Sequence, residues 1–158
     1  MIELDIMVEA GDWARLEDAE ALAQRASEAA VAAAGKADDD FEVSVMLTDD
    51  AHMREINRAW RGKDKPTNVL SFPAPEQPGV AGPRHLGDIA LAYETLARES
   101  EEESKDLAHH FAHLIVHGVL HLLGYDHEDE AEADIMEALE VKALATLGIA
   151  DPYRDMAA

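Results

Sequence analysis

The segment of residues 117–127 constrains the local structure of this chain more than any other. His117 and His121 are four residues apart, so a helix places them one turn apart on the same face. Gly124 follows where such a helix would end, because glycine adopts the left-handed cap conformation without steric cost. The chain can then fold back and bring His127 in as a third ligand. Three protein ligands with an open fourth position are typical of catalytic zinc sites.

The same spacing, H-x-x-x-H-x-x-G-x-x-H, occurs in metzincin proteases, which differ from this chain at one position. Those enzymes carry glutamate directly after the first histidine, where it acts as the general base. This chain has Gly118 there, and glycine cannot transfer a proton. The sequence therefore predicts a similar metal cage with different chemistry, and the general base is not assigned. A metalloprotease remains an alternative that the ligand spacing favours and Gly118 opposes.

A row of histidines at four-residue steps leaves a second choice of ligand pair. The row consists of His109, His113, His117 and His121. Each step turns about 40° around an α-helix, so at most two neighbours share one ion with good geometry. The rival cage is His113 with His117. We favour His117 with His121, because only this pair leads into the Gly124 turn and a third histidine.

Three nearby side chains each have two interpretations. His113 is either a group close to the site or a core histidine bonded to the backbone. Asp126 either orients a ligand imidazole or is an ordinary turn residue. Trp60 could stack on a base, but a tryptophan at a helix end more often lies at the edge of the core, which we favour.

The absence of cysteine narrows the metal site further. With no thiolate in the chain, the ligands must be histidine, carboxylate or water. We therefore predict one zinc ion per chain, held by His117, His121 and His127. Nickel, copper and iron also accept imidazole ligands, so the sequence does not decide the metal.

The charge of the chain limits how it can bind nucleic acid. The formal net charge of −21 repels phosphate and disfavours non-specific binding. An RNA-directed function must therefore use a local basic patch. Such a patch consists of Arg58, Arg61, Lys63 and Lys65, opposed only by Asp64. The alternative is a solvated loop in which basic residues cluster by chance.

Hydrophobic patterning predicts strands and helices in alternation. The expected strands are residues 2–8, 42–47, 68–72 and 86–92, the last broken at Gly87–Asp88. The expected helices are residues 13–34, 49–61, 93–104, 106–123 and 128–147. Residues 73–85 contain four prolines and are predicted to form an exposed loop, the best candidate for a mobile flap. We expect an α/β (α+β) fold with a single small mixed sheet of about four strands packed by about five helices.

The length of 158 residues suggests one domain, and we expect residues 1–158 to form a single metal-dependent hydrolase domain. The first residues are acidic where a signal peptide would be basic. No apolar stretch approaches the roughly 18 residues of a membrane span. A cytoplasmic protein without a membrane partner is therefore predicted.

Two separate motifs resemble a known family. Residues 117–127 closely resemble the signature of the YbeY family, bacterial endoribonucleases that act in ribosomal RNA maturation. Residues 57–73 look like the other strongly patterned stretch of this family. Residues 86–89 resemble its next strand and residues 151–153 its usual ending, so the resemblance extends from about residue 42 to residue 153.

The resemblance implies an α/β fold with a small mixed sheet and one metal, usually taken as zinc, at His117, His121 and His127. It also implies an RNA-facing, catalytic role for Arg61 in a single-strand-specific endoribonuclease of 16S rRNA 3′-end maturation and ribosome quality control. Beside Arg61, we expect Arg58, Lys63 and Lys65 to bind the substrate. The implied partners are ribosomal RNA and the small-subunit proteins or assembly factors that deliver it. A second alternative is a non-catalytic ribosome-assembly factor with a structural zinc.

Overall fold

The computed structural model describes residues 1–75 and 82–153. Within them, one sheet contains β1 (Ile2–Val8), β2 (Phe41–Thr48), β3 (Val69–Pro73) and β4 (Arg84–Ala92). The helices are α1 (Ala19–Ala33), α2 (Asp50–Arg61), α3 (Tyr93–Glu102), α4 (Leu107–Leu122) and α5 (Glu130–Thr146), with a short 3-10 helix, η1 (Gly11–Arg15). The predicted α/β fold, a small mixed sheet packed by helices, is confirmed.

The order of the strands is β1-β2-β4-β3, which the sequence alone did not reveal. The strands β1 and β4 run parallel to β2 on either side, whereas β3 pairs antiparallel with β4. In β2, the alternate residues Val43, Val45 and Leu47 are buried, as expected for a strand with one face in the core. The helix α1 makes the crossover that the parallel pair of β1 and β2 requires.

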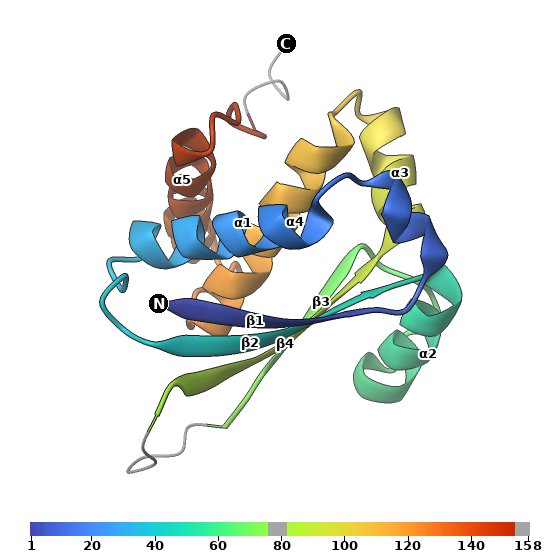
Figure 1. The fold of residues 1–158 in the computed structure, drawn as a ribbon, viewed down its shortest axis with the longest axis horizontal. Coiled ribbons are helices and arrows are strands. Elements are labelled where there is room, and N and C mark those ends of the chain that lie inside the picture. The colour runs from blue at the N-terminus through green and yellow to red at the C-terminus, as the bar shows by residue number, and fades with distance from the viewer. Residues whose placement is uncertain (76–81, 154–158) are drawn as a thin grey trace.

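Helices pack on both faces of the sheet, and one face carries more of them than the other. Figure 1 shows α1, α4 and α5 gathered on one side of the sheet, with α2 apart from them. Ile89 and Leu91 of β4 belong to the large core, whereas Ala90 and Ala92 pack in a smaller cluster with Met53 of α2. Successive side chains of a strand point to opposite faces, so α2 covers the second face. The site described below lies where α4 and α5 meet on the first face.

The helix predicted over residues 13–34 is divided, which corrects the sequence-based boundary. Trp13 is buried in η1, where its ring contacts Tyr93 and Phe111 and its indole N–H donates to the carbonyl of Thr48 at 2.9 Å. Asp18, with φ of 53°, then adopts the left-handed conformation directly before α1. Insertion of this tryptophan into the core therefore outweighs the helix propensity of the residues around it.

The predicted break at Gly87–Asp88 is also wrong, because β4 runs through it as a single strand. Gly87 has a φ of +144°, and the pairing of β2 with β4 shifts register opposite it. A Cβ at this position would overlap the carbonyl oxygen of Phe72 in β3. Glycine therefore permits a bulge and a close approach of two strands. The flap predicted in residues 73–85 is shorter than expected, because Pro73 belongs to β3 and residues 84–85 belong to β4; residues 76–81 lie outside the described residues.

In residues 1–75 and 82–153, none of the helices combines the length and the apolar character needed to cross a bilayer.

Candidate functional site

The helix α4 carries the first two predicted ligands. Asp106 caps its N-terminus by accepting from the backbone N–H of His109 at 3.2 Å. At its C-terminus, Gly124 has a φ of +107°, and its N–H donates to the carbonyl of His121 at 3.0 Å. The chain turns back after this glycine, so that the ring centroids of His117 and His127 lie 5.5 Å apart.

This separation is compatible with one shared metal ion. Zinc lies about 2.0–2.1 Å from a ligating imidazole nitrogen, so two rings on a tetrahedral zinc have centroids about 5 Å apart. Burial lowers the pKa of His121, and the nearby positive charges of His117, Arg61 and His127 lower it further, against the carboxylate of Asp126. The neutral imidazole that results is the form that binds metals. The donor set therefore fits zinc.

The three imidazoles are not yet arranged as a closed shell. Among the described residues, no group of three histidine, aspartate or glutamate side chains is placed to hold a metal ion. His127 lies on the loop after α4 with its side chain 60% exposed. An exposed side chain changes rotamer within nanoseconds, so a small movement of His127 could complete the set.

Glu140 of α5 was missed from the sequence, although it contacts two of the histidines. Its side chain is 1% exposed. The oxygen Oε1 accepts from Nε2 of His113 and from the hydroxyl of Tyr153, the latter at 2.6 Å. The oxygen Oε2 accepts from Nδ1 of His117 at 3.2 Å. The sequence did hold a signal, because Glu140 interrupts the buried stripe of Met136, Ala143 and Leu144 on α5.

The charge of Glu140 follows from these donors. Burial alone would raise the pKa of Glu140, but hydrogen bonds from His113, His117 and Tyr153 lower it to about 2. Conversely, burial and the bond to Glu140 raise the pKa of Tyr153 above its usual value. Glu140 is therefore an ionised carboxylate at neutral pH, which can only accept hydrogen bonds. Each of the two histidine nitrogens that contact it must consequently carry a proton.

These contacts decide between the two interpretations of His113 and disfavour its rival cage. His113 bonds to a side chain rather than to the backbone, and its Nε2 is occupied by Glu140. Its Nδ1 is buried and has no hydrogen-bond partner among the described residues. His117 instead contacts Glu140 through Nδ1, which leaves Nε2 available to a metal.

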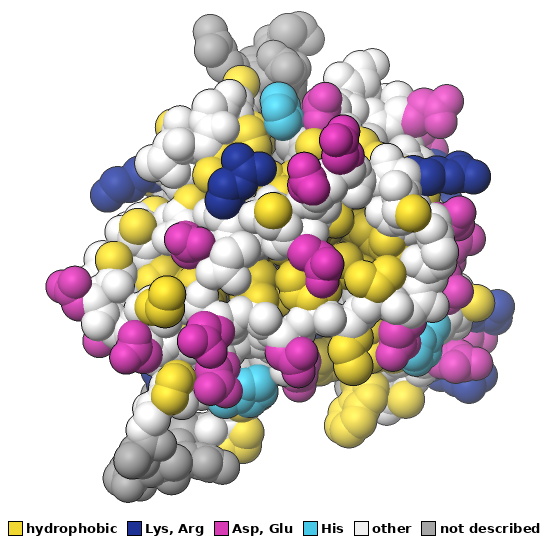
Figure 2. Space-filling model, in the orientation of Figure 1, with side chains coloured by type: hydrophobic (Ala, Val, Ile, Leu, Met, Phe, Trp, Pro, Cys, Tyr) yellow, Lys and Arg dark blue, Asp and Glu magenta, His cyan; other side chains and the backbone are white. Residues whose placement is uncertain are grey.

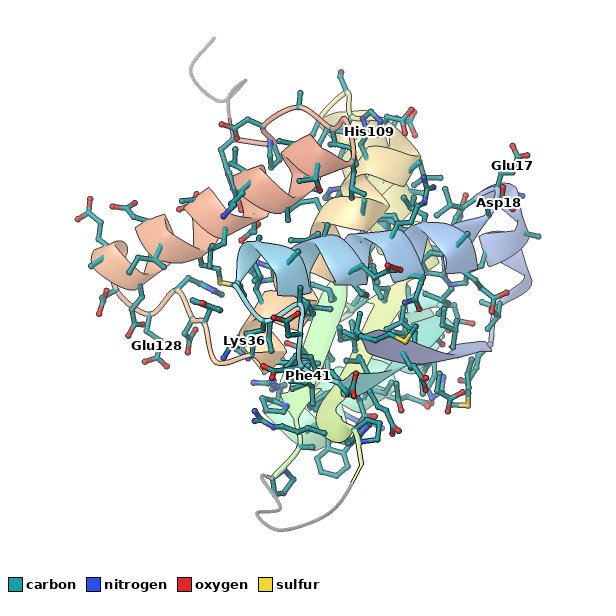
Figure 3. The ribbon with its side chains drawn as sticks, turned by 60° about the vertical axis from the view of Figure 1, so that its left-hand side comes forward. Glu17, Asp18, Lys36, Phe41, His109 and Glu128 are labelled. Carbon is teal, nitrogen blue, oxygen red and sulfur yellow. The ribbon has the colours of Figure 1, made fainter. Side chains whose placement is uncertain are left out.

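His109, the first histidine of the row, lies apart from the loop that carries His127. It is exposed at the start of α4, and Figure 3 shows it remote from Glu128, the residue that follows His127.

Asp126 acts as a turn residue in this structure. Its Oδ1 accepts from the backbone N–H of His127 at 2.7 Å. The same oxygen lies 3.9 Å from Nδ1 of His127, which is too long for a hydrogen bond. The observed contact therefore holds the loop rather than the imidazole.

Arg61 lies at the end of α2 and contacts β3. Its guanidinium donates to the carbonyl of Ser71 at 2.8 Å and lies 5.3 Å from the centroid of the Phe72 ring. It is also one of the charges that lower the pKa of His121. The structure thus brings Arg61 together with residues about sixty positions later in the chain.

The rest of the predicted basic patch follows Arg61 on an exposed segment. The buried Asn57 holds this segment, because its carbonyl accepts from the N–H of Lys63 at 3.3 Å and its amide donates to the carbonyl of Lys65 at 2.8 Å. The side chains of Arg58, Lys63 and Lys65 are exposed beside this frame.

Asp64, the acid within this patch, is bound by a residue outside it. Both carboxylate oxygens accept from Arg54, at 2.8 and 3.1 Å, and this bond lowers the pKa of Asp64. The other basic side chains are therefore available to an anionic ligand.

Trp60 corrects an interpretation made from the sequence. Its side chain is 74% exposed, so it is not part of the core edge. Its ring centroid lies 6.3 Å from that of Phe72, and both line a groove of about 560 Å³ on the sheet face that α2 partly covers. The position of Trp60 at the end of a helix does not reveal whether the sheet covers its side chain.

Comparison with known proteins then identifies the family. The profile described as endoribonuclease YbeY matches residues 8–148. The chain belongs to this family. The endoribonuclease YbeY of Bradyrhizobium diazoefficiens is 56% identical over 155 residues, which cover 96% of this chain and 85% of that protein. The endoribonuclease YbeY of Azorhizobium caulinodans is 53% identical over 153 residues, 96% of each chain.

A solved structure supports the fold. The solution structure of TM1509 from Thermotoga maritima matches with a TM-score of 0.58 and 24% sequence identity, covering 92% of both chains. At this identity the likeness concerns the fold alone. The predicted resemblance to the YbeY family is thus confirmed over nearly the whole chain.

Proposed function

We propose that this chain is a single-strand-specific, metal-dependent endoribonuclease of 16S rRNA 3′-end maturation and ribosome quality control. Residues 1–158 would act as one hydrolase domain in the cytoplasm. The observation that carries the proposal is the pairing of His117 with His127 after the Gly124 turn, with Arg61 near enough for its charge to act on His121, because a cationic fork near imidazole ligands suits a phosphodiester. The names of its relatives support ribonuclease chemistry.

The roles follow from the residues. His117, His121 and His127 would hold one zinc ion, which when bound supplies Lewis-acid polarisation and acidifies water. Arg61 pairs with the phosphate and stabilises the negative charge that grows in the transition state. Its carbonyl contact with Ser71 holds the guanidinium near the site. Arg58, Lys63 and Lys65 guide the RNA backbone.

Delivery of the substrate needs help from other molecules. Figure 2 shows acidic side chains scattered over the face that it draws, among apolar side chains and a few basic ones. Together with the net charge of −21, they disfavour binding of RNA to this face. We therefore propose that small-subunit ribosomal proteins or assembly factors present the ribosomal RNA.

The packing of Gly118 weighs against a protease. A Cβ on Gly118 would lie 3.0 Å from the terminal methyl carbon of Ile89, so α4 packs tightly on β4 at this position. The glutamate that metzincin proteases carry there would require the Ile89 side chain to shift. A digest of casein checks this alternative, since chelator-sensitive proteolysis would support it.

The test of the proposal is cleavage of single-stranded ribosomal RNA by zinc-loaded protein. The parent is compared with His121→Ala and with the matched control His109→Ala, which removes an exposed imidazole from the same helix. Cleavage by the parent and the control, but not by His121→Ala, is expected. Equal weak cleavage by all three would indicate a contaminant and favour the assembly factor with a structural zinc.

The stability of the variant separates these two readings. If the zinc only holds the loop after α4, His121→Ala should unfold as it loses function. A His121→Ala protein that melts as a folded domain but leaves RNA intact would argue for catalysis.

A further inference from the structure

We infer that Glu140 is a positioning residue of this site, which fixes the tautomer and orientation of His117 so that Nε2 faces the metal position. The inference rests on the proposed function only in taking His117 as a ligand. Glu140 itself would touch neither metal nor RNA. It acts through the hydrogen bond between its Oε2 and Nδ1 of His117.

The Glu140 carboxylate is buried among apolar side chains and depends on specific hydrogen-bond donors. Its neighbours on the buried side of α5 are Met136, Ala143 and Leu144, all apolar. A charged group in such surroundings is strongly destabilising unless hydrogen-bond donors replace its water. Here three donors do so, and two of them come from the histidine row of α4. An apolar residue would have satisfied the packing alone.

The two oxygens of Glu140 divide their tasks. Oε1 accepts from His113 and from Tyr153, so these residues anchor the carboxylate from α4 and from the segment after α5. Oε2 is left for His117. The anchor holds the carboxylate plane, and the second oxygen then holds the imidazole.

The tautomer follows from this geometry. A carboxylate oxygen accepts hydrogen bonds, so the 3.2 Å contact between Oε2 and Nδ1 places the proton on Nδ1 of His117. In the neutral ring this leaves the lone pair on Nε2. Histidine ligands in metal sites usually donate their second nitrogen to such a partner, and loss of the partner typically lowers metal affinity about 10–100-fold.

Nuclear magnetic resonance of metal-free protein labelled with ¹⁵N-histidine tests the inference directly. Spectra are taken near pH 8, above the usual histidine pKa of about 6.5. In the parent, His117 is expected as the Nδ1–H tautomer. In Glu140→Leu it should shift toward the Nε2–H form, with a smaller shift in Glu140→Gln, whose amide oxygen can still accept. The exposed Asp134→Asn, on the same helix, is the control for lost charge and should leave the tautomer unchanged.

Zinc affinity, measured by competition with a chelator, is the second readout. We expect the dissociation constant for zinc to rise about 10–100-fold in Glu140→Leu and to stay unchanged in Asp134→Asn. A parent with Nε2–H on His117 would overturn the inference even if no Glu140 variant folds. A folded Glu140→Leu with unchanged tautomer and zinc affinity would also overturn it. Neither readout uses RNA, so a parent that fails to cleave RNA refutes the proposed function without touching this inference.

Discussion

Replacement of Arg61 separates catalysis from stability. Arg61 makes one exposed hydrogen bond, to Ser71 at 2.8 Å, and one cation–π contact, 5.3 Å from the centroid of Phe72. Contacts of these kinds are each worth about 0.5–1 kcal/mol. Arg61→Ala should therefore lower the unfolding free energy by about 1–2 kcal/mol, a fall of about 2–8 °C in melting temperature for a chain of this size.

The same change should reduce RNA cleavage far more. Loss of one donor that stabilises transition-state charge typically costs about 10²–10³ in kcat, or roughly 3–4 kcal/mol. The assay is the initial rate of cleavage of a single-stranded rRNA fragment at saturating zinc. Arg61→Lys keeps the charge but loses the planar fork, so its rate should be intermediate.

The control is Arg25→Ala, which removes one positive charge from the exposed side of α1. It should leave the cleavage rate unchanged, because Arg25 is not among the charges that act on His121. The role given to Arg61 is wrong if Arg61→Ala cleaves within threefold of the parent. It is equally wrong if the loss of rate is matched by loss of folded protein.

Three further predictions concern stability. Gly87→Ala should cost at least about 2 kcal/mol in urea denaturation, because its φ is +144° and a Cβ would meet the carbonyl of Phe72; a neutral change would refute this. Folding lowers the pKa of Glu140 from 4.5 to about 2, so ionised Glu140 stabilises the folded state above pH 4.5, and this stabilisation of about 3 kcal/mol is lost as the pH falls toward 2. In Glu140→Gln, the unfolding free energy should therefore fall by about 3 kcal/mol less than in the parent over the same pH range. A chelator should lower the melting temperature of zinc-loaded parent but not that of His121→Ala, since ligands stabilise only the state that binds them.

Much of the local structure could be predicted from the sequence because its causes are local. Alternating Val43, Val45 and Leu47 indicate a strand with one buried face, and β2 has that form. The fold-back after Gly124, inferred from the histidine spacing, is present in the structure. Asp49 caps α2 by accepting from the N–H of His52 at 2.8 Å, a local bond that aspartate before a helix commonly makes.

What the sequence did not reveal depends on contacts between distant segments. The helix predicted over residues 13–34 is divided because the ring of Trp13 packs on Tyr93 and Phe111, far along the chain. The strand order depends on the way the crossovers pass over the sheet. Glu140 lies 23 residues after His117, and only the packing of α5 on α4 brings them together. Its position in an apolar stripe was the one available signal, and an acidic residue there should prompt a search for donors.

The measurement that tests the central claim most directly is a zinc titration of metal-free protein with RNA cleavage recorded at each step. If His117, His121 and His127 hold one catalytic ion, the rate should rise in proportion to added zinc and level off at one ion per chain. His127→Ala should neither bind zinc tightly nor cleave. Cleavage that is independent of zinc, or equal in His127→Ala and the parent, would contradict the account.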